Sequence, residues 1–281
     1  MIAKNLTQVL TAVSCAAAGV AMSVSPAQAV QLFFGEDLHN DAFTQIGATP
    51  NASQAELDFL SNLVGVGTED FEGVPTGASA PLSLSFPGAG TATLSATLSG
   101  NGSVSTVSAT GTNERGRYAT SGTNFWEAVA EDGSFSIAFS EAIAAFGFYG
   151  IDIGDFGGQL ELVLSLANGG TQTITAPNTS GVNGGGVVNI IDGRPIAGSS
   201  TDGSVLYLGL LAESAEELFT GISFQLSTGE GDVFAFDDLT IGSLEQVVIL
   251  DPPTDVPEPS AMVGLFAVVA LGLGLRRKKT T

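Results

Sequence analysis

The fold class follows from a stretch of six residues, Ser134-Phe135-Ser136-Ile137-Ala138-Phe139, in which small or polar side chains alternate with apolar ones. Successive side chains of a β-strand point to opposite faces, so this period of two predicts a strand with one buried face. The same alternation occurs in the segments 82–86, 92–96, 104–107, 145–149, 160–164, 205–208 and 222–226. Turn-forming residues such as Gly100-Asn101-Gly102 separate these segments.

So many short strands without intervening helices predict a mostly β protein, with an antiparallel β-sandwich or jelly roll over residues 68–250. A parallel β-helix is the alternative for a chain with 37 glycines, but no fixed short repeat is visible. Residues 30–67 are expected to form a lead-in with one short helix over 54–64. Ser53 and Glu56 have the spacing of a capping box at its start.

The N-terminal end has the parts of a secretory signal peptide. Lys4 precedes an apolar stretch over 9–24, and Ala27-Gln28-Ala29 forms a small-x-small cleavage site. We therefore expect signal peptidase to remove residues 1–29. A membrane-spanning helix is the alternative, but polar residues interrupt the stretch, which is short for a bilayer. The single cysteine, Cys15, lies in this signal, so the mature chain has no disulfide.

The C-terminal end also has a recognisable order of parts. Residues 251–259 read Asp-Pro-Pro-Thr-Asp-Val-Pro-Glu-Pro, and such a density of proline predicts a stiff, extended linker. Residues 260–281 then predict a transmembrane helix with a basic tail, since no charged residue occurs before the cluster 276–279. The positive-inside rule keeps this cluster in the cytoplasm and the body of the chain outside. A plain tail anchor is the alternative.

The sequence Val256-Pro257-Glu258-Pro259-Ser260, with the glycine-interrupted apolar segment and the terminal Arg-Arg-Lys-Lys, resembles the PEP-CTERM sorting domain of Gram-negative bacteria. The resemblance implies a sorting motif at Pro257, Glu258 and Pro259, recognised by an exosortase-type membrane enzyme that cuts nearby. It also implies an exported protein, transiently anchored in the cytoplasmic membrane, that ends at the cell surface or in an extracellular matrix rich in polysaccharide, as in biofilms.

Three motifs in the body resemble exported β-sandwich proteins with this tail, which are similar in layout to carbohydrate-binding modules. They are Phe71-Glu72-Gly73, Ala145-Phe146-Gly147-Phe148-Tyr149-Gly150 and Phe234-Ala235-Phe236-Asp237-Asp238-Leu239. Such sandwiches often bind a structural Ca²⁺ where the first and last strands meet. The resemblance therefore implies Ca²⁺ as cofactor, with the carboxylates of Asp70 or Glu72 joining Asp237 or Asp238 as oxygen ligands.

The pair Asp237-Asp238 is also unusual as a local pattern. In an alternating strand over 233–241 its two side chains point to opposite faces unless the strand contains a bulge. A carboxylate on the inward face needs a partner. The alternative is that these acids cap loops or face water. A second acidic segment, 152–158, is interpreted as a tight turn rather than a cation site.

Charge and aromatic content limit the possible functions. Between residues 30 and 256, three arginines stand against 28 acidic residues, a net charge near −25. Such a body repels nucleic acid and anionic lipid and attracts cations. The single tryptophan, Trp126, is a candidate for stacking on a sugar ring, although a core position is the preferred interpretation. The single histidine, His39, lies in the lead-in, and no catalytic residue is assigned.

The sequence therefore predicts a non-enzymatic, exosortase-sorted protein of the cell surface or extracellular matrix, with a Ca²⁺-stabilised β-sandwich. Two alternatives stay open. One is a carbohydrate-binding module that retains extracellular polysaccharide. The other is a glycan-active enzyme that uses a pair of its many carboxylates. The expected partners are an exosortase-type enzyme, signal peptidase and polysaccharide, but not nucleic acid.

Overall fold

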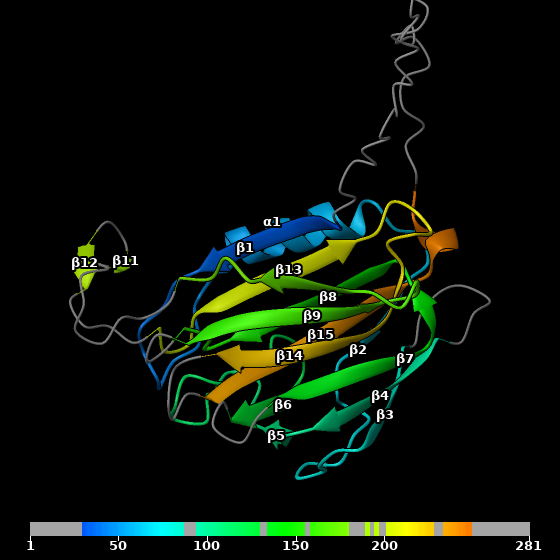
Figure 1. The fold of residues 1–281 in the computed structure, drawn as a ribbon. Helices are drawn as coiled ribbons and strands as arrows, with labels where there is room; N and C mark the ends of the chain where they lie inside the picture. Colours follow the sequence, from blue (N-terminus) through cyan, green and yellow to red (C-terminus); the bar gives the residue numbers. More distant parts are fainter. Residues whose placement is uncertain are drawn as a thin grey trace, which may run out of the picture.

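The computed structural model describes residues 30–86, 94–129, 134–154, 158–179, 189–191, 194–196, 201–227 and 233–248. This part of the chain is mostly β and forms two antiparallel sheets, which confirms the predicted β-sandwich class (Figure 1). It also contains the helix α1 (Pro50–Leu60) and a short 3₁₀ helix at Leu244–Gln246. The strands are β1 (Gln31–Asp37), β2 (Gly67–Glu69), β3 (Leu82–Ser85), β4 (Ser95–Gly100), β5 (Ser103–Thr106), β6 (Asn124–Val129), β7 (Phe135–Ile143), β8 (Ala145–Ile151), β9 (Gln159–Leu166), β10 (Thr171–Thr175), β11 (Asn189–Ile191), β12 (Arg194–Ile196), β13 (Val205–Leu211), β14 (Phe219–Ser227) and β15 (Val233–Gly242).

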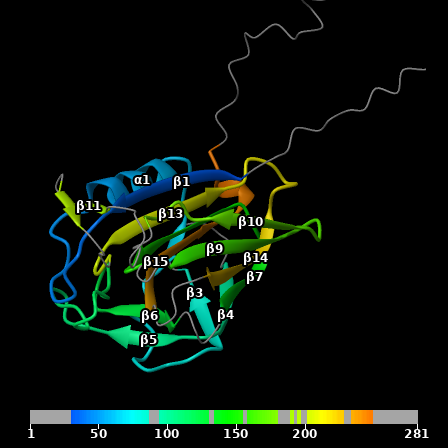
Figure 2. The same cartoon turned by 60° about the vertical axis from the view of Figure 1, so that its left-hand side comes forward.

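The two sheets form the layers of the sandwich. The helix-side sheet has the strand order β1-β13-β8-β15-β6-β5, with β2 added beside β15, and the second sheet has the order β10-β9-β14-β7-β4-β3 (Figure 2). The strands β11 and β12 pair with each other. Strand β1 pairs with β13 along its whole length. The lead-in predicted for residues 30–67 is therefore part of the sandwich, because its first strand closes one edge of the helix-side sheet.

The helix α1 begins at Pro50 and ends at Leu60, whereas the sequence predicted a helix over 54–64. A proline at the first helical position loses no hydrogen bond, which explains the earlier start. Ser53 therefore lies inside the helix, where its hydroxyl is 3.1 Å from the hydroxyl of Thr49. The predicted capping box does not form, since the N-cap has no side-chain hydrogen bond.

Aromatic side chains fill the space between the two sheets. The rings of Phe135 and Phe224, both from the second sheet, stack with their centroids 4.3 Å apart. Phe236 from the helix-side sheet meets Phe135 edge-on at 5.0 Å. Trp126 lies in this same core, with 0% of its surface exposed, so its ring faces are not available to a sugar. The candidate role of Trp126 in ligand binding is therefore wrong, and its core position agrees with the preferred interpretation.

The helix covers the opposite face of the helix-side sheet, so that β8 and β13 are buried on both faces (Figure 1). Gly147 of β8 and Gly209 of β13 are directly opposite each other in the register. A Cβ atom added at Gly209 would lie 2.6 Å from the ring of Phe59 on α1, and one at Gly147 would lie 2.8 Å from the same ring. Glycine at both positions allows this close approach of the helix to the sheet.

Candidate binding pocket and adjacent acidic cluster

A β-bulge in β15 places the two neighbouring aspartates. Asp237 pairs with Tyr149 of β8 and Thr240 pairs with Gly147, so three steps along β15 match two steps along β8. Asp238 has a φ of +48°, in the left-handed region that bulged residues can adopt. The bulge predicted as a possibility from the sequence is therefore present, and it lets both carboxylates turn to the same side of the strand. Both lie within hydrogen-bond distance of the loop at residues 120–121.

Asp237 is fully buried, and its hydrogen bonds hold the loop at residues 120–121 against β15. Its Oδ2 atom accepts hydrogen bonds from the backbone N–H groups of Thr120, at 2.7 Å, and Ser121, at 3.1 Å. Its Oδ1 atom accepts the N–H of Asp238 at 2.8 Å. Burial, and secondly the charge of Asp238, raise the pKa of Asp237 well above its ordinary value, although these hydrogen bonds oppose the shift.

Asp238 is half-buried, and two hydroxyl groups hold it. Ser121 Oγ donates to its Oδ1 atom at 2.7 Å, and Thr120 Oγ1 lies 2.9 Å from its Oδ2 atom. The same Thr120 hydroxyl also lies 3.0 Å from Asp237 Oδ2, although it carries a single proton to share between them. Burial raises the pKa of Asp238, and the negative charges of Asp70 and Glu72 raise it further. A proton or a cation between these acids would relieve the repulsion.

Asp70 and Glu72 follow β2, next to the same end of β15. Glu72 Oε1 accepts the N–H groups of Thr123 and Asn124, each at 2.6 Å. Partial burial would raise the pKa of Glu72, but these two hydrogen bonds lower it overall. Asp70 is exposed, and its Oδ1 atom accepts the N–H of Glu72 at 3.1 Å. The structure thus brings all four predicted metal-ligating acids into one cluster, where each influences Asp238.

The geometry of this acidic cluster is not that of a formed metal site. Among the described residues, no group of three or more acid, histidine or cysteine side chains converges as metal ligands do. Asp237 Oδ2 already has three donors, so this atom has little capacity left for a cation. The oxygens of Asp238 are held by hydroxyl groups, which can rotate and themselves act as ligands. Within the described part of the chain, the ion pairs involve only Arg117, and none of the four acids has a basic partner.

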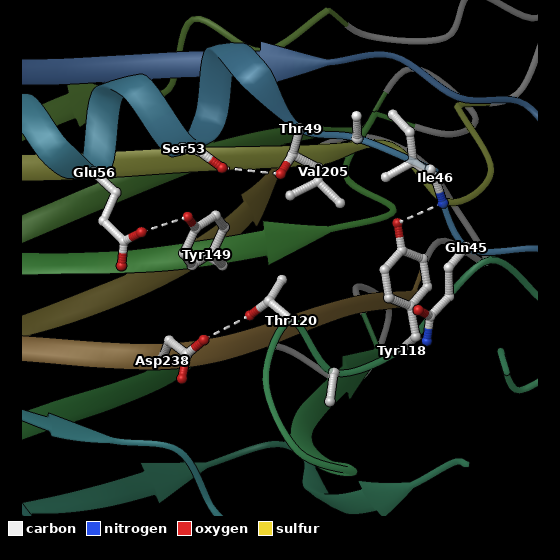
Figure 3. Close-up of a pocket in the computed structure, with 13 residues that line it drawn as sticks. Gln45, Ile46, Thr49, Ser53, Glu56, Tyr118, Thr120, Tyr149, Val205 and Asp238 are labelled. Atoms are coloured by element: carbon white, nitrogen blue, oxygen red, sulfur yellow. Dashed lines mark hydrogen bonds between the residues drawn. The ribbon is translucent and has the colours of Figure 1, made fainter. Parts of the chain in front are cut away.

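A pocket of about 320 Å³ lies beside Asp238, on the face of the sheet that α1 covers in part (Figure 3). This volume is at the lower end of the range for small-molecule sites. The walls come from α1, from the loop before it, from the loop before β6, and from β8, β13 and β15. The lining residues are Gln45, Ile46, Gly47, Ala48, Thr49, Ser53, Glu56, Tyr118, Ala119, Thr120, Tyr149, Val205 and Asp238.

Glu56 projects from α1 into this pocket toward Tyr149 (Figure 3). The phenol of Tyr149 donates a hydrogen bond to Glu56 Oε2 at 2.7 Å. Burial raises the pKa of Glu56, the bond from Tyr149 opposes the shift, and the charge of Asp238 adds to it. The pocket therefore contains two carboxylates, one from the helix and one from the bulged strand, that repel each other across it.

Tyr118 fixes the opposite wall of the pocket. Its hydroxyl donates to the carbonyl of Gly203 at 2.8 Å and accepts the N–H of Ile46 at 3.3 Å. Gln45 is tied to the same region because its side-chain amide donates to the carbonyl of Gly111 at 2.8 Å. These bonds connect the loop before α1 to the loop before β6, so the pocket is bounded by loops that the fold holds in place.

The other acidic segment has a structural role. Asp152, the buried first residue of segment 152–158, accepts a hydrogen bond from Arg117 Nη1 at 3.0 Å. Arg117 Nε also pairs with Glu127 at 2.9 Å, and Nη1 is near the carbonyl of Val233 at 3.3 Å. Residues 152–154 form a bend and a turn, and residues 155–157 of the segment lie outside the described residues. Arg117 is one of the three arginines between residues 30 and 256, and its buried side chain links strands to loops.

Comparison with known protein families identifies the C-terminal end. Residues 255–278 match the PEP-CTERM protein-sorting motif, which contains the predicted sorting residues Pro257, Glu258 and Pro259. The chain thus carries a signal for export and for exosortase processing at the membrane on the way to the cell surface. These residues, the predicted tail helix over 260–281 and the predicted signal peptide over 1–29 lie outside the residues that the structure describes. Within the described ranges, no helix is both long and apolar enough to cross a membrane.

Three solved structures are similar to this chain. The K2 cleaved adhesin domain of Lys-gingipain has 14% identity and a TM-score of 0.36, over 63% of this chain and 97% of that one. The C-terminal family 22 carbohydrate-binding module of Clostridium thermocellum Xyn10B has 12% identity and a TM-score of 0.33, over 64% and 94%. The family 11 carbohydrate-binding module of Clostridium thermocellum, solved with a β-1,3-1,4-mixed-linked tetrasaccharide, has 16% identity and a TM-score of 0.26, over 64% and 98%. No curated protein matches the chain.

Proposed function

We propose that this exported protein is a non-enzymatic binding protein of the cell surface, which retains extracellular polysaccharide through the pocket beside α1. The observation that carries the proposal is the lining of that pocket, in which hydroxyl, amide and carboxylate groups surround a space of about 320 Å³. A sugar ring presents hydroxyl groups that both donate and accept hydrogen bonds, and such a lining offers partners for both. The sorting signal directs the sandwich to the cell surface, where it could meet extracellular polysaccharide.

A second candidate function is glycan hydrolysis, because Glu56 and Asp238 form a pair of carboxylates in one pocket. Hydrolysis needs one carboxyl group that stays protonated and a second that stays ionised. Here burial raises the pKa values of both groups, and each acid has a hydroxyl donor. Their environments do not separate the two roles, so binding is the better supported function.

The test is titration of the purified exported protein with polysaccharides, measured by calorimetry, together with an assay for new reducing ends. Saturable binding without release of reducing ends supports the proposal. Release of reducing ends that disappears in both Glu56→Gln and Asp238→Asn would instead establish the enzyme. Failure to bind any polysaccharide, in a protein that melts cooperatively, would overturn the proposal.

We also propose Ca²⁺ as a stabilising ion at the acidic cluster. Support comes from four acids at one end of the sandwich, without a basic partner among the described residues, and from a pKa of Asp238 that burial and its neighbours raise. Asp70 and Asp238 fit the oxygen-ligand chemistry of Ca²⁺ best, since backbone N–H groups already hold Asp237 and Glu72. In this proposal Asp237 and Glu72 position the loop over 120–124, and Asp70 and Asp238 hold the ion.

A further inference from the structure

The pocket beside α1 has an electrostatic character that narrows the choice of ligand. Two of its described lining residues, Glu56 and Asp238, are acidic, and none is lysine, arginine or histidine. Both side chains are half-buried, and each accepts hydrogen bonds from hydroxyl groups of the protein. An anionic ligand would add a third negative charge to a desolvated space, which is unfavourable. The pocket therefore selects against uronic acids, sulfated sugars and phosphates.

The hydrogen-bonding capacity of the two acids is only partly used within the protein. Tyr149 occupies Glu56 Oε2, whereas Glu56 Oε1 has no hydrogen bond to any described residue. Ser121 and Thr120 donate to Asp238 through hydroxyl groups, and a rotating hydroxyl can accept from a ligand instead. Acceptors thus converge on the pocket from the helix and from the bulged strand, and the matching ligand group is a cation with several N–H donors.

The size of the pocket and its other lining residues indicate the kind of molecule to which the cationic group belongs. A bare metal ion would occupy only a small part of the pocket, which leaves room for a larger group that carries the positive charge. The space of about 320 Å³ is suited to a small organic ring, and Gln45, Thr49 and Ser53 add an amide and two hydroxyl groups to its walls. These groups match the hydroxyl groups of a sugar.

We propose that the pocket binds a protonated amino sugar unit of a polysaccharide, with its ammonium group between Glu56 and Asp238. An ammonium group has three donors and a full positive charge, so hydrogen bonds from it to the two carboxylates are charge-assisted. The sugar hydroxyl groups pair with the polar side chains of the wall. This inference rests on the proposed function and specifies its ligand as glycans with free amino groups, as opposed to fully N-acetylated or neutral ones.

The experiment compares two ligands of the same length in calorimetric titrations of the exported protein, oligomers of β-1,4-linked glucosamine and their fully N-acetylated counterparts. The buffer contains a chelator, because Ca²⁺ at the proposed ion site would compete for Asp238. Acetylation removes the charge and keeps the sugar framework. The expected result is roughly tenfold or tighter binding of the free-amine oligomer, as for the loss of one charge-assisted hydrogen bond. Glu56→Gln and Asp238→Asn should each remove most of this preference. Both keep the size of the side chain. The amide oxygen can still accept the bond from Tyr149 in Glu56→Gln and one of the two hydroxyl bonds in Asp238→Asn.

The matched control is Glu141→Gln, an equal change of net charge at an exposed position on β7 of the second sheet. It should leave the preference unchanged, which separates the pocket from the general attraction of cations to an acidic protein. Equal affinity for the two oligomers, or equal loss of preference in the control, overturns the ammonium site and leaves polysaccharide binding intact. If neither oligomer nor any other polysaccharide binds, the proposed function fails as well.

Discussion

Replacing Arg117 with methionine should destabilise the sandwich strongly. The guanidinium has a side-chain exposure of 7% and pairs with Asp152, which is 2% exposed, and with Glu127, which is 23% exposed. Removing one partner of a buried ion pair leaves an uncompensated buried charge and costs about 3–5 kcal/mol. The hydrogen bonds from Arg117 Nη1 to the backbone carbonyls of Arg115 and Val233 would also be lost. For a domain of this size, we expect the melting temperature to fall by roughly 6–20 °C.

The assay is thermal and urea unfolding of Arg117→Met beside Arg115→Met, the same chemical change at an exposed neighbouring position. The control should stay within about 0.5 kcal/mol of the original protein. The double variant Arg117→Met with Asp152→Asn should lose less than the sum of its two single changes, because the second removes the stranded charge. A loss below about 1 kcal/mol in Arg117→Met would refute the reasoning, since it would mean that Asp152 does not need this partner.

Four other measurements check separate parts of the structure. Gly209→Ala should cost about 1–3 kcal/mol, because its Cβ would meet the Phe59 ring at 2.6 Å, whereas Gly73→Ala, with open space around it, should be nearly neutral. Burial raises the pKa of Glu36 from 4.5 to about 7, so the folded state holds this proton more tightly than the unfolded chain and stability falls as pH rises between these values. Glu36→Gln should therefore reduce the difference in stability between pH 5 and pH 8 by up to ~3 kcal/mol, and an unchanged difference would contradict the shift. Ca²⁺ at a hundredfold excess over its Kd should stabilise the protein by ~2.7 kcal/mol more than Na⁺ at equal ionic strength. Asp238→Ala should abolish this difference between the two ions. Equal stabilisation of the original protein by both ions would refute the proposed Ca²⁺ site. Intact-mass measurement of the exported protein should show loss of residues 1–29 and of the segment after Pro259, and an extracellular form that retains Lys279 would rule out this processing.

The sequence predicted four strands of the second sheet, β3, β7, β9 and β14, because their side chains alternate between the core and the solvent side. In β7 the buried positions alternate with less buried ones from Phe135 to Phe139, as the pattern required. Strand β1 was missed for the opposite reason. Its adjacent Phe33 and Phe34 are both partly buried, because one face packs under α1 and the other toward the sandwich core. Apolar residues on both faces removed the period of two from β1. The strands β8 and β13 are also covered on both faces, but their segments were found from the sequence.

The sequence predicted only the part of the site where adjacent residues break the alternating pattern of a strand. Two adjacent acids in a strand cannot both face water without a bulge, and the sequence therefore pointed to Asp237 and Asp238. The pocket was missed because its parts are distant in sequence, as the separation of 93 positions from Glu56 to Tyr149 illustrates. One signal was present. Glu56 lies on the helix face that buries Ala52 and Phe59, and an acid within an apolar stripe needs a partner.

The distance between α1 and the sheet affects both the stability of the fold and the geometry of the pocket. The glycine pair Gly147 and Gly209 lets Phe59 approach the strands closely, and Glu56 lies one helical turn before Phe59 on the same face. Tyr149 follows Gly147 on β8 by two positions, and Asp238 lies beside it on the neighbouring strand β15. Both residues line the pocket. An alanine at either glycine would push α1 away from the sheet and would therefore move Glu56 away from Tyr149 and Asp238. The glycines that the fold needs for close packing thus also set the spacing of the two carboxylates that the proposed ligand would contact.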